Sequence, residues 1–193
     1  MEAYWYFDFA SPFSYLQLAK VREWRSRLPV TPVPISARAL PKATPEAEMP
    51  AAEDVENSVD RFVRWRAKAA GLTLNFPSTY PFNSFAALRL CVAAGNSWSA
   101  IGAIFDHLWR DGNDGMLAHE LVTVGKSLGI ADPVAAITVA ESAATVRAST
   151  IAALALGISS VPTVRIGGKL FSGSQAADEV DAFLALPPMR RTA

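Results

Sequence analysis

The stretch that most constrains the fold is residues 4–16, which read Tyr-Trp-Tyr-Phe-Asp-Phe-Ala-Ser-Pro-Phe-Ser-Tyr-Leu. Its first six residues are rich in aromatic side chains, which favour a strand because wide rings pack well on a pleated surface. Ser11 is a good N-cap, and Pro12 suits the first helical position, where its missing N–H costs nothing. Apolar residues then recur at helical spacing from Phe13 to Trp24. The chain is therefore predicted to open with a strand, a tight turn and a helix.

Ser11 has two interpretations at this stage. Its hydroxyl either does no more than cap the helix, by accepting a hydrogen bond from an otherwise unpaired amide of the first turn, or it also helps to hold an anion. The second interpretation has a physical basis, because the exposed N–H groups and the dipole at a helix N-terminus both favour negative charge. The stretch by itself leaves both open.

Composition narrows the class of partner. The 18 basic and 18 acidic residues cancel, so we expect neither nucleic acid nor an anionic membrane surface as a main partner. The single cysteine, Cys91, allows no internal disulfide and lies in an apolar helical segment, which is typical of an inert core thiol. No apolar run approaches the roughly 18 residues that span a bilayer, and the start of the chain lacks the basic segment of a secretory signal. We therefore expect a soluble, cytoplasmic protein.

The middle of the chain is predicted to be helical. A second strand is expected at Val30–Ser36, parallel to the first, and its two prolines are typical of an edge strand. Residues 37–57, rich in Pro, Ala and Glu, are expected to form a loop or lid. Helical patterns without an intervening strand follow at about 59–70, 85–94, 98–109, 117–128 and 133–156. His107 and His119 fall in separate segments with no carboxylate or cysteine at metal-ligand spacing, so we expect no metal site.

The end of the chain returns to β-structure. Thr163–Ile166 and Lys169–Ser172 are short β-rich runs joined by Gly167-Gly168, which predicts a hairpin, and a helix is expected at about 177–186. Val161-Pro162, just before the hairpin, is a candidate cis peptide. The order of elements predicts an α/β domain split into residues 1–38 and 157–193. Residues 39–156 are expected to form the lid loop and a helical insertion.

This order of elements resembles a known fold. A βαβ unit, a helical insert and a ββα unit led by Val-Pro-Thr are similar to the DsbA-like thioredoxin fold of the disulfide oxidoreductases. Ser11-Pro12-Phe13-Ser14 stands where the redox members carry Cys-Pro-x-Cys. The chain therefore resembles the branch without redox cysteines, the kappa-class glutathione transferases and 2-hydroxychromene-2-carboxylate isomerases. The segments that carry the resemblance are Phe7–Leu16, Lys42-Ala43-Thr44, Pro81-Phe82-Asn83-Ser84 and Gly157–Thr163.

The resemblance implies glutathione as the cofactor. The family serine that matches Ser11 hydrogen-bonds the glutathione sulfur and favours its thiolate, which makes Ser11 the expected catalytic residue. A thiol of ordinary pKa near 8.5 is mostly protonated at neutral pH, so such a donor would raise the reactive fraction. The full set of expected glutathione-binding residues is Ser11, Lys42, Val161, Pro162, Ser174 and Gln175.

Within that set, Lys42 matches a family lysine near the glycyl carboxylate, where a compact cation helps to hold an anion. Val161, ahead of a cis Pro162, is expected to pair its backbone with the tripeptide as an added strand. Ser174 and Gln175 stand where family members usually carry an acidic residue, and often an arginine, at the γ-glutamyl end. Pro45-Glu46 likewise replaces the usual Gly-Asn, so altered glutathione binding would follow from either change.

Three functions remain open from the sequence. The first is a glutathione-dependent isomerase of 2-hydroxychromene-2-carboxylate-type substrates, in which the thiolate adds, the ring opens, a bond rotates and glutathione leaves. The second is a kappa-like glutathione transferase acting on other electrophiles. The third is a non-catalytic thioredoxin-fold binding module that no longer binds the cofactor. The resemblance further implies a small aromatic substrate and a homodimer.

Overall fold

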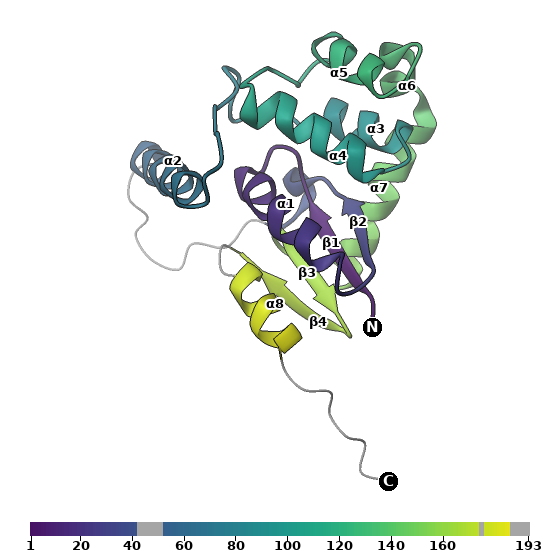
Figure 1. Cartoon of the computed structure of the whole chain (residues 1–193). Helices are drawn as coiled ribbons and strands as arrows, with labels where there is room; N and C mark the ends of the chain where they lie inside the picture. The colour runs from purple at the N-terminus through teal and green to yellow at the C-terminus, as the bar shows by residue number, and fades with distance from the viewer. Residues whose placement is uncertain (42–51, 174–175, 186–193) are drawn as a thin grey trace.

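Four strands form one mixed sheet at the centre of the protein. The computed structural model describes residues 1–41, 52–173 and 176–185. The sheet has the order β2-β1-β3-β4 (Figure 1), and its strands are β1 (Ala3–Phe7), β2 (Val30–Pro34), β3 (Thr163–Ile166) and β4 (Lys169–Ser172). β1 runs parallel to β2 and antiparallel to β3, and β3 and β4 form a hairpin. The predicted thioredoxin-like α/β fold is confirmed, with β2 at an edge as its prolines indicated.

The described helices surround this sheet. A 3₁₀ turn, η1 (Ala37–Ala39), follows β2, and a π-helical turn, η2 (Asp106–Arg110), extends α4. A second 3₁₀ turn, η3 (Ala118–Leu121), leads into α5. The helices are α1 (Pro12–Trp24), α2 (Ala52–Ala69), α3 (Phe85–Ala93), α4 (Trp98–Phe105), α5 (Val122–Ser127), α6 (Pro133–Thr138), α7 (Ala140–Ala155) and α8 (Ala176–Ala185). None of these described helices is both long and apolar enough to cross a membrane.

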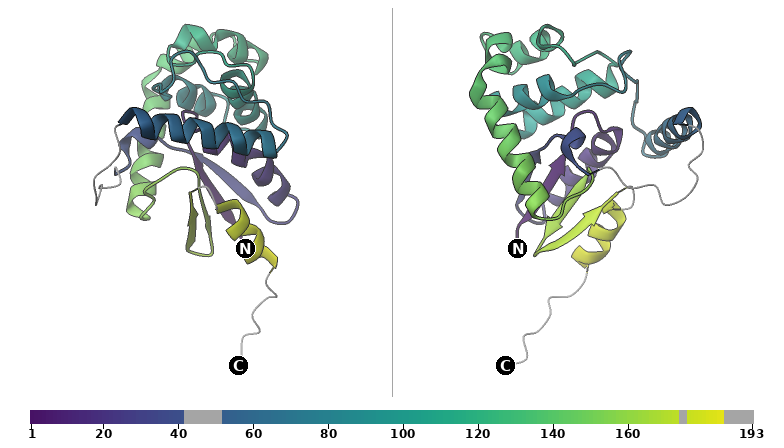
Figure 2. Two further views of the ribbon diagram at one scale, coloured as in Figure 1. Left: turned by 90° about the vertical axis from the view of Figure 1, so that its left-hand side faces the viewer. Right: turned by 180° about the vertical axis from the view of Figure 1, so that it is seen from behind.

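The two faces of the sheet are covered by different helices. α1 and α8 lie over one face and α7 lies over the other, as the rear view in Figure 2 shows. α3 to α6 form a block beyond one end of the strands, and α2 lies beside α1. The helices between β2 and β3 in the chain therefore cover one end of the sheet and one of its faces.

Successive side chains of β1 point to opposite faces of the sheet, so they pack against different helices. Trp5 and Phe7 are fully buried and stacked at 4.3 Å between ring centroids, on the side of α1 and the helical block. Tyr6 points to the other face, where it packs with Ile35 and with Ala153 of α7. One core cluster joins the sheet to helices on both sides of the predicted boundaries, and the division at residues 38 and 157 stays a prediction.

The predicted helices at 98–109 and 117–128 each include a 3₁₀ or π-helical turn, and two others differ more from the structure. The helix expected from Val59 begins at Ala52, so the predicted loop over 37–57 is shorter at its C-terminal end. The segment expected as one helix over 133–156 is two helices, because Val139 has an extended backbone with φ −61° and ψ 137°. The Ser142 hydroxyl donates to the carbonyl oxygens of Ile137 (3.3 Å) and Val139 (2.8 Å). These two carbonyl groups therefore have a hydrogen-bond donor where α6 ends and α7 begins.

Candidate functional site

The turn between β1 and α1 places Ser11 at the N-terminus of a 13-residue helix. Ser11 is the N-cap of α1, and its Oγ accepts a hydrogen bond from the Ser14 N–H at 3.2 Å, so the predicted cap is confirmed. A hydroxyl has one donor and two acceptor sites, and the cap uses only an acceptor. No described residue accepts a hydrogen bond from this hydroxyl. Because the cap uses only an acceptor site, the Ser11 O–H can donate to a ligand while the cap stays in place.

The buried carboxylate of Asp8 stabilises this turn through hydrogen bonds. Asp8 is fully buried, and its two carboxylate oxygens accept hydrogen bonds from the backbone N–H groups of Ala10 (2.9 Å) and Ala37 (2.6 Å). The Ser11 N–H donates to the Asp8 carbonyl oxygen at 3.1 Å. Burial raises the pKa of Asp8, while hydrogen bonds from the Ser84 hydroxyl and the two backbone amides oppose that rise. Asp8 thus ties the turn to the segment after β2 and to the start of α3.

A tryptophan of the helical block holds the same turn from outside the sheet. Trp109, in η2, is fully buried, and its Nε1–H donates to the carbonyl oxygen of Phe9 at 2.8 Å. The Phe9 ring lies 4.7 Å from the ring of Phe105 at the end of α4. The helical block therefore fixes the backbone two residues before Ser11.

The Val161-Pro162 peptide bond is cis, as predicted. β3 pairs with β1 so that Thr163 lies opposite Tyr6, which puts Pro162 at the edge of the sheet where β1 ends and the turn to Ser11 begins. No described residue forms a hydrogen bond with the backbone N–H or carbonyl of Val161. The structure thus brings two predicted site segments, the Ser11 turn and Val161-Pro162, to one edge.

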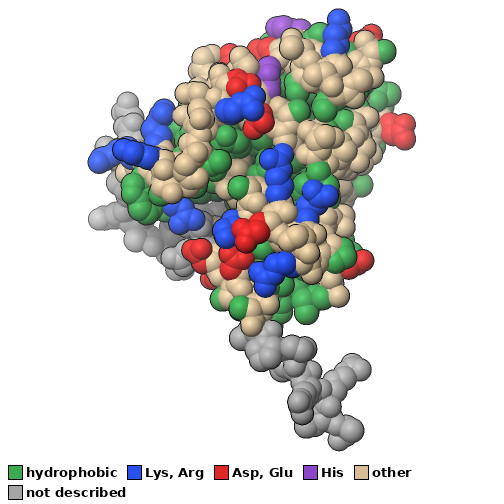
Figure 3. Space-filling model, in the orientation of Figure 1, with side chains coloured by type: hydrophobic (Ala, Val, Ile, Leu, Met, Phe, Trp, Pro, Cys, Tyr) green, Lys and Arg blue, Asp and Glu red, His purple; other side chains and the backbone are tan. Residues whose placement is uncertain are grey.

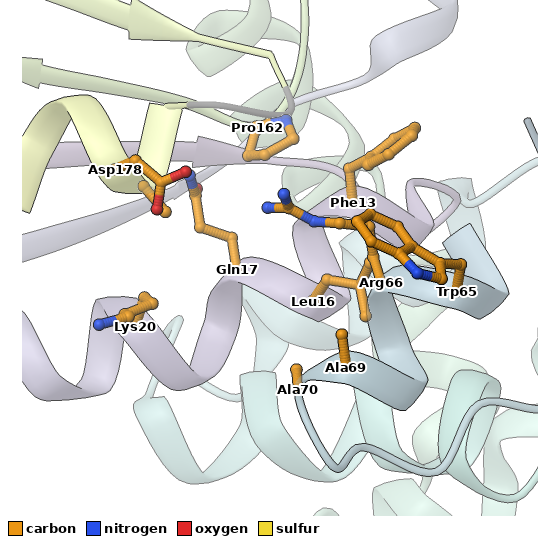
Figure 4. Close-up of a pocket in the computed structure, with 11 residues that line it drawn as sticks. Phe13, Leu16, Gln17, Lys20, Trp65, Arg66, Ala69, Ala70, Pro162 and Asp178 are labelled. Carbon is orange, nitrogen blue, oxygen red and sulfur yellow. The ribbon is translucent and has the colours of Figure 1, made fainter. Parts of the chain in front are cut away.

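A cavity of about 320 Å³ opens beside this edge (Figure 4). One face of α1, the C-terminal part of α2, the first turn of α8 and Pro162 line it. Phe13 and Trp65 give it an aromatic end, and Arg66 points its guanidinium group into the space. The polar side chains that line it are Gln17, Lys20, Arg66 and Asp178.

Two of these polar groups are held by neighbours. The buried Gln17 side chain accepts a hydrogen bond at Oε1 from Trp5 Nε1 at 2.8 Å, so its amide N–H groups remain for the cavity. Lys20 forms ion pairs with Asp181 (3.1 Å) and Glu23 (3.2 Å), and hydrogen bonds to these carboxylates, Asp181 first, raise its pKa.

Some predicted residues cannot be compared with the structure, whereas Cys91 is buried as predicted. Lys42, Ser174 and Gln175 lie outside the described residues. Cys91 is fully buried in α3, and burial raises the pKa of its thiol, which keeps it protonated. Within the described ranges, no three His, Cys, Asp or Glu side chains gather in a way that could hold a metal ion.

Sequence reasoning missed Asp8, Trp109, Trp65 and Arg66 as residues that build this site. A carboxylate between Phe7 and Phe9 in an aromatic strand was the one local signal, because a buried charge needs hydrogen-bond partners. The other three residues reach the site only through tertiary packing.

Comparisons with known proteins agree with this architecture. The family model of the DsbA-like thioredoxin domain matches residues 4–185. No curated protein has a sequence that matches the chain. A solved structure of 2-hydroxychromene-2-carboxylate isomerase is similar with a TM-score of 0.78 and 20% sequence identity, covering 95% of this chain and 94% of the other.

Disulfide oxidoreductases are similar as well. A probable DsbA oxidoreductase from Streptomyces coelicolor gives a TM-score of 0.73 at 18% identity, covering 98% of this chain and 93% of its own. The cytosolic disulfide reductase DsbM from Pseudomonas aeruginosa, in a structure with GSH, gives 0.62 at 13% identity, covering 96% of this chain and 100% of its own. At these identities the likeness shows the fold alone. Because the family model matches nearly the whole chain, the protein belongs to the DsbA-like thioredoxin family.

Proposed function

We propose that the protein is a glutathione-dependent isomerase of 2-hydroxychromene-2-carboxylate-type substrates. Bound glutathione would supply a thiolate that adds reversibly to the conjugated substrate, so that the opened ring can rotate to the trans-hydroxybenzylidene pyruvate before the thiolate leaves. The observation that carries the proposal is the Ser11 hydroxyl, which caps α1 through an acceptor site and keeps its proton available.

The described residues fit a glutathione thiolate at this position. The Ser11 O–H can donate to a sulfur anion, and the N-terminus of α1 favours negative charge at the same place. The backbone of Val161, which has no hydrogen-bond partner among the described residues, can pair with an extended peptide. These groups bind and orient a cysteinyl residue and hold its sulfur in the deprotonated state.

Redox chemistry like that of the disulfide reductases is disfavoured by the residues present. Disulfide exchange needs an attacking thiolate on the enzyme. Serines occupy both positions of the motif, Ser11 and Ser14, and the chain's one cysteine is buried with a raised thiol pKa. The site is therefore better suited to activating the thiol of a bound cofactor than to exchanging disulfides.

The non-catalytic module is the alternative from a different class. It is favoured by Ser174-Gln175, which carry no charge for the γ-glutamyl end. Against it, Asp178 stands three residues beyond Gln175 in the first turn of α8, and this carboxylate lines the cavity (Figure 4). A carboxylate at that position can pair with the ammonium group of glutathione.

Glutathione binding and isomerisation are tested together. We expect glutathione to raise the melting temperature, with about 2.7 kcal/mol of stabilisation at one hundred times its Kd. S-methylglutathione, which has no thiol to ionise, is expected to bind without supporting turnover of 2-hydroxychromene-2-carboxylate. No shift at millimolar glutathione would favour the binding module. Glutathione-dependent conjugation of another electrophile, without isomerisation, would favour the kappa-like transferase.

A further inference from the structure

A second cavity, of about 290 Å³, lies between α3 and α7. The facing sides of these two helices and the segment after β2 line it, and none of its described lining residues also lines the cavity beside Ser11. α7 covers the face of the sheet opposite to α1 and α8, as the rear view in Figure 2 shows. The second cavity is therefore separate from the candidate site, and its volume is at the lower end of the range of small-molecule sites.

Apolar side chains of this cavity face water. Ile151 and Leu154 on α7 line it and are 59% and 37% exposed, and Phe85 at the start of α3 is 39% exposed. Single exposed apolar side chains are common on protein surfaces, but these three come together at one cavity. A ligand that covered them would remove apolar surface from water.

Two arginines give the cavity a positive charge. Arg89 on α3 and Arg147 on α7 both line it, whereas none of its described lining residues is acidic. Neither arginine forms an ion pair within the part of the chain that the structure describes. By contrast, Lys20 and Arg110 contact carboxylates, and Figure 3 shows basic side chains next to acidic ones on the α1 side of the molecule. An anion in this cavity would therefore meet positive charge without an opposing carboxylate from the described lining.

Arg89 has an unsatisfied hydrogen-bond donor. Its Nε is buried and has no acceptor among the described residues, and its guanidinium carbon lies 6.0 Å from the centre of the Phe85 ring. Buried polar atoms in folded proteins nearly always have a partner, so an unpaired donor indicates a group that a ligand or an ion can satisfy. A carboxylate is a suitable partner, because its two oxygens match the planar donors of a guanidinium group.

We propose that the second cavity binds an alkyl carboxylate of medium chain length. The carboxylate pairs with Arg89 and Arg147, and the hydrocarbon chain covers Ile151, Leu154 and Phe85. An alkyl chain fits this cavity better than an aromatic ring does, because the apolar lining is aliphatic apart from Phe85. This binding is independent of the proposed function, since it requires neither Ser11 nor glutathione.

Isothermal titration calorimetry with octanoate on the full chain tests this site. Octanamide has the same chain length without the charge, and butyrate has the same charge on a shorter chain. We expect octanoate to bind at least about tenfold more tightly than either, because each buried CH₂ group contributes up to about fourfold in affinity. Equal affinity for octanoate and octanamide, or for octanoate and butyrate, would overturn the proposal.

Variants assign the charge of the carboxylate to this cavity. Arg147→Gln is expected to remove most of the preference for octanoate over octanamide, and the exposed position of Arg147 makes a loss of folding unnecessary. Arg61→Gln is the matched control, because Arg61 is an exposed arginine of α2 outside the described lining of both cavities, and we expect it to change neither affinity. If the two variants behave alike, the charge of the cavity does not bind the carboxylate and the proposal is wrong.

A second pair of variants assigns the hydrocarbon chain. Ile151→Ser is expected to weaken octanoate binding about fivefold, since it removes apolar surface from the cavity wall. Leu156→Ser is its control, because Leu156 is a 46% exposed residue at the end of α7 outside the described lining. Trp65→Leu, in the cavity beside Ser11, is expected to leave octanoate binding unchanged. Weaker binding in Trp65→Leu but not in Ile151→Ser would place the ligand in the other cavity and refute the proposal; melting temperatures check that every variant folds.

Discussion

At the scale of single residues, the Ser11 hydroxyl caps α1, and the proposed function gives the same group a second role that the sequence presented as an alternative. The cap occupies an acceptor site of the oxygen, whereas holding a thiolate requires the proton. The cap and the proposed role are therefore compatible in one hydroxyl, and substitution can separate them.

Ser11→Ala is expected to lower the free energy of unfolding by about 0.5–2 kcal/mol through loss of the cap, and also to reduce turnover at neutral pH. Ser11→Asp is expected to keep the cap and suit the helix dipole, yet to lose turnover because its charge repels a thiolate. Melting temperature and the thiolate absorbance of bound glutathione against pH check both variants.

A matched control comes from another helix. Ser97 caps α4 by the same bond, its Oγ accepting from the Ala100 N–H at 3.3 Å. Ser97→Ala is expected to cost similar stability without lowering turnover. If Ser11→Asp kept full turnover, or Ser11→Ala lost stability alone, Ser11 would be a cap and nothing more.

Asp8 makes stability depend on pH in a direction that can be measured. Its raised pKa means that the folded state binds the proton more tightly than the unfolded state. The contribution of Asp8 to the free energy of unfolding therefore falls as pH rises from its ordinary value of about 3.9 through the raised value.

Asp8→Asn removes this titration and leaves one of the two backbone N–H groups, of Ala10 or Ala37, facing an amide donor. We expect a loss of about 1–3 kcal/mol. We also expect the difference in free energy of unfolding between wild type and variant to become smaller as pH rises. The wild type loses stability over this range, and the variant does not. Denaturant unfolding at a series of pH values measures the gap, and a gap that widens with pH would contradict the assignment.

At the scale of elements, the junction of α6 and α7 shows how a helix start can lack a capping side chain. Val139 is the N-cap of α7, is 49% exposed, and offers no side-chain acceptor to the first turn. Its backbone is already extended, as an N-cap requires.

Val139→Ser is therefore expected to raise the free energy of unfolding by about 0.5–2 kcal/mol, because the new hydroxyl can accept from an N–H of that turn. Val134→Ser, the same change at a 39% exposed position inside α6, is the control and is expected to give no gain. Chemical denaturation of both variants measures the difference, and equal effects would show that capping is not the cause.

At the scale of the whole molecule, local patterns were enough to predict an α/β domain with a helical insertion, whereas the thioredoxin-like fold was predicted from the family resemblance. Aromatic β-propensity at β1, the Ser11-Pro12 helix start and the Gly167-Gly168 hairpin are signals carried by neighbours in the chain. The order of these elements predicted the α/β class, since the strands of a short strand–helix–strand unit are parallel and those of a tight hairpin are antiparallel. The predicted homodimer and the predicted compartment stay predictions.

The parts that the sequence could not give depend on distant contacts. The break at Val139 lies in a run whose composition favours helix throughout, so periodicity did not reveal it. Arg66 and Trp65 have the pattern of an ordinary surface helix until α2 is placed against α1, which turns them toward a cavity. Side chains that act across such distances leave no spacing in the sequence to detect.

The hydrogen bond from Trp109 to the Phe9 carbonyl limits the modularity of the protein. The four strands with α1 and α8 look like a unit that could be excised or grafted, yet the turn that positions Ser11 is completed by a residue 100 positions further along the chain. Without the helical block, a buried carbonyl would lose its donor and the aromatic rings around Phe9 would face water. A miniaturised version of this protein would therefore lose the contacts that position Ser11 at the start of α1.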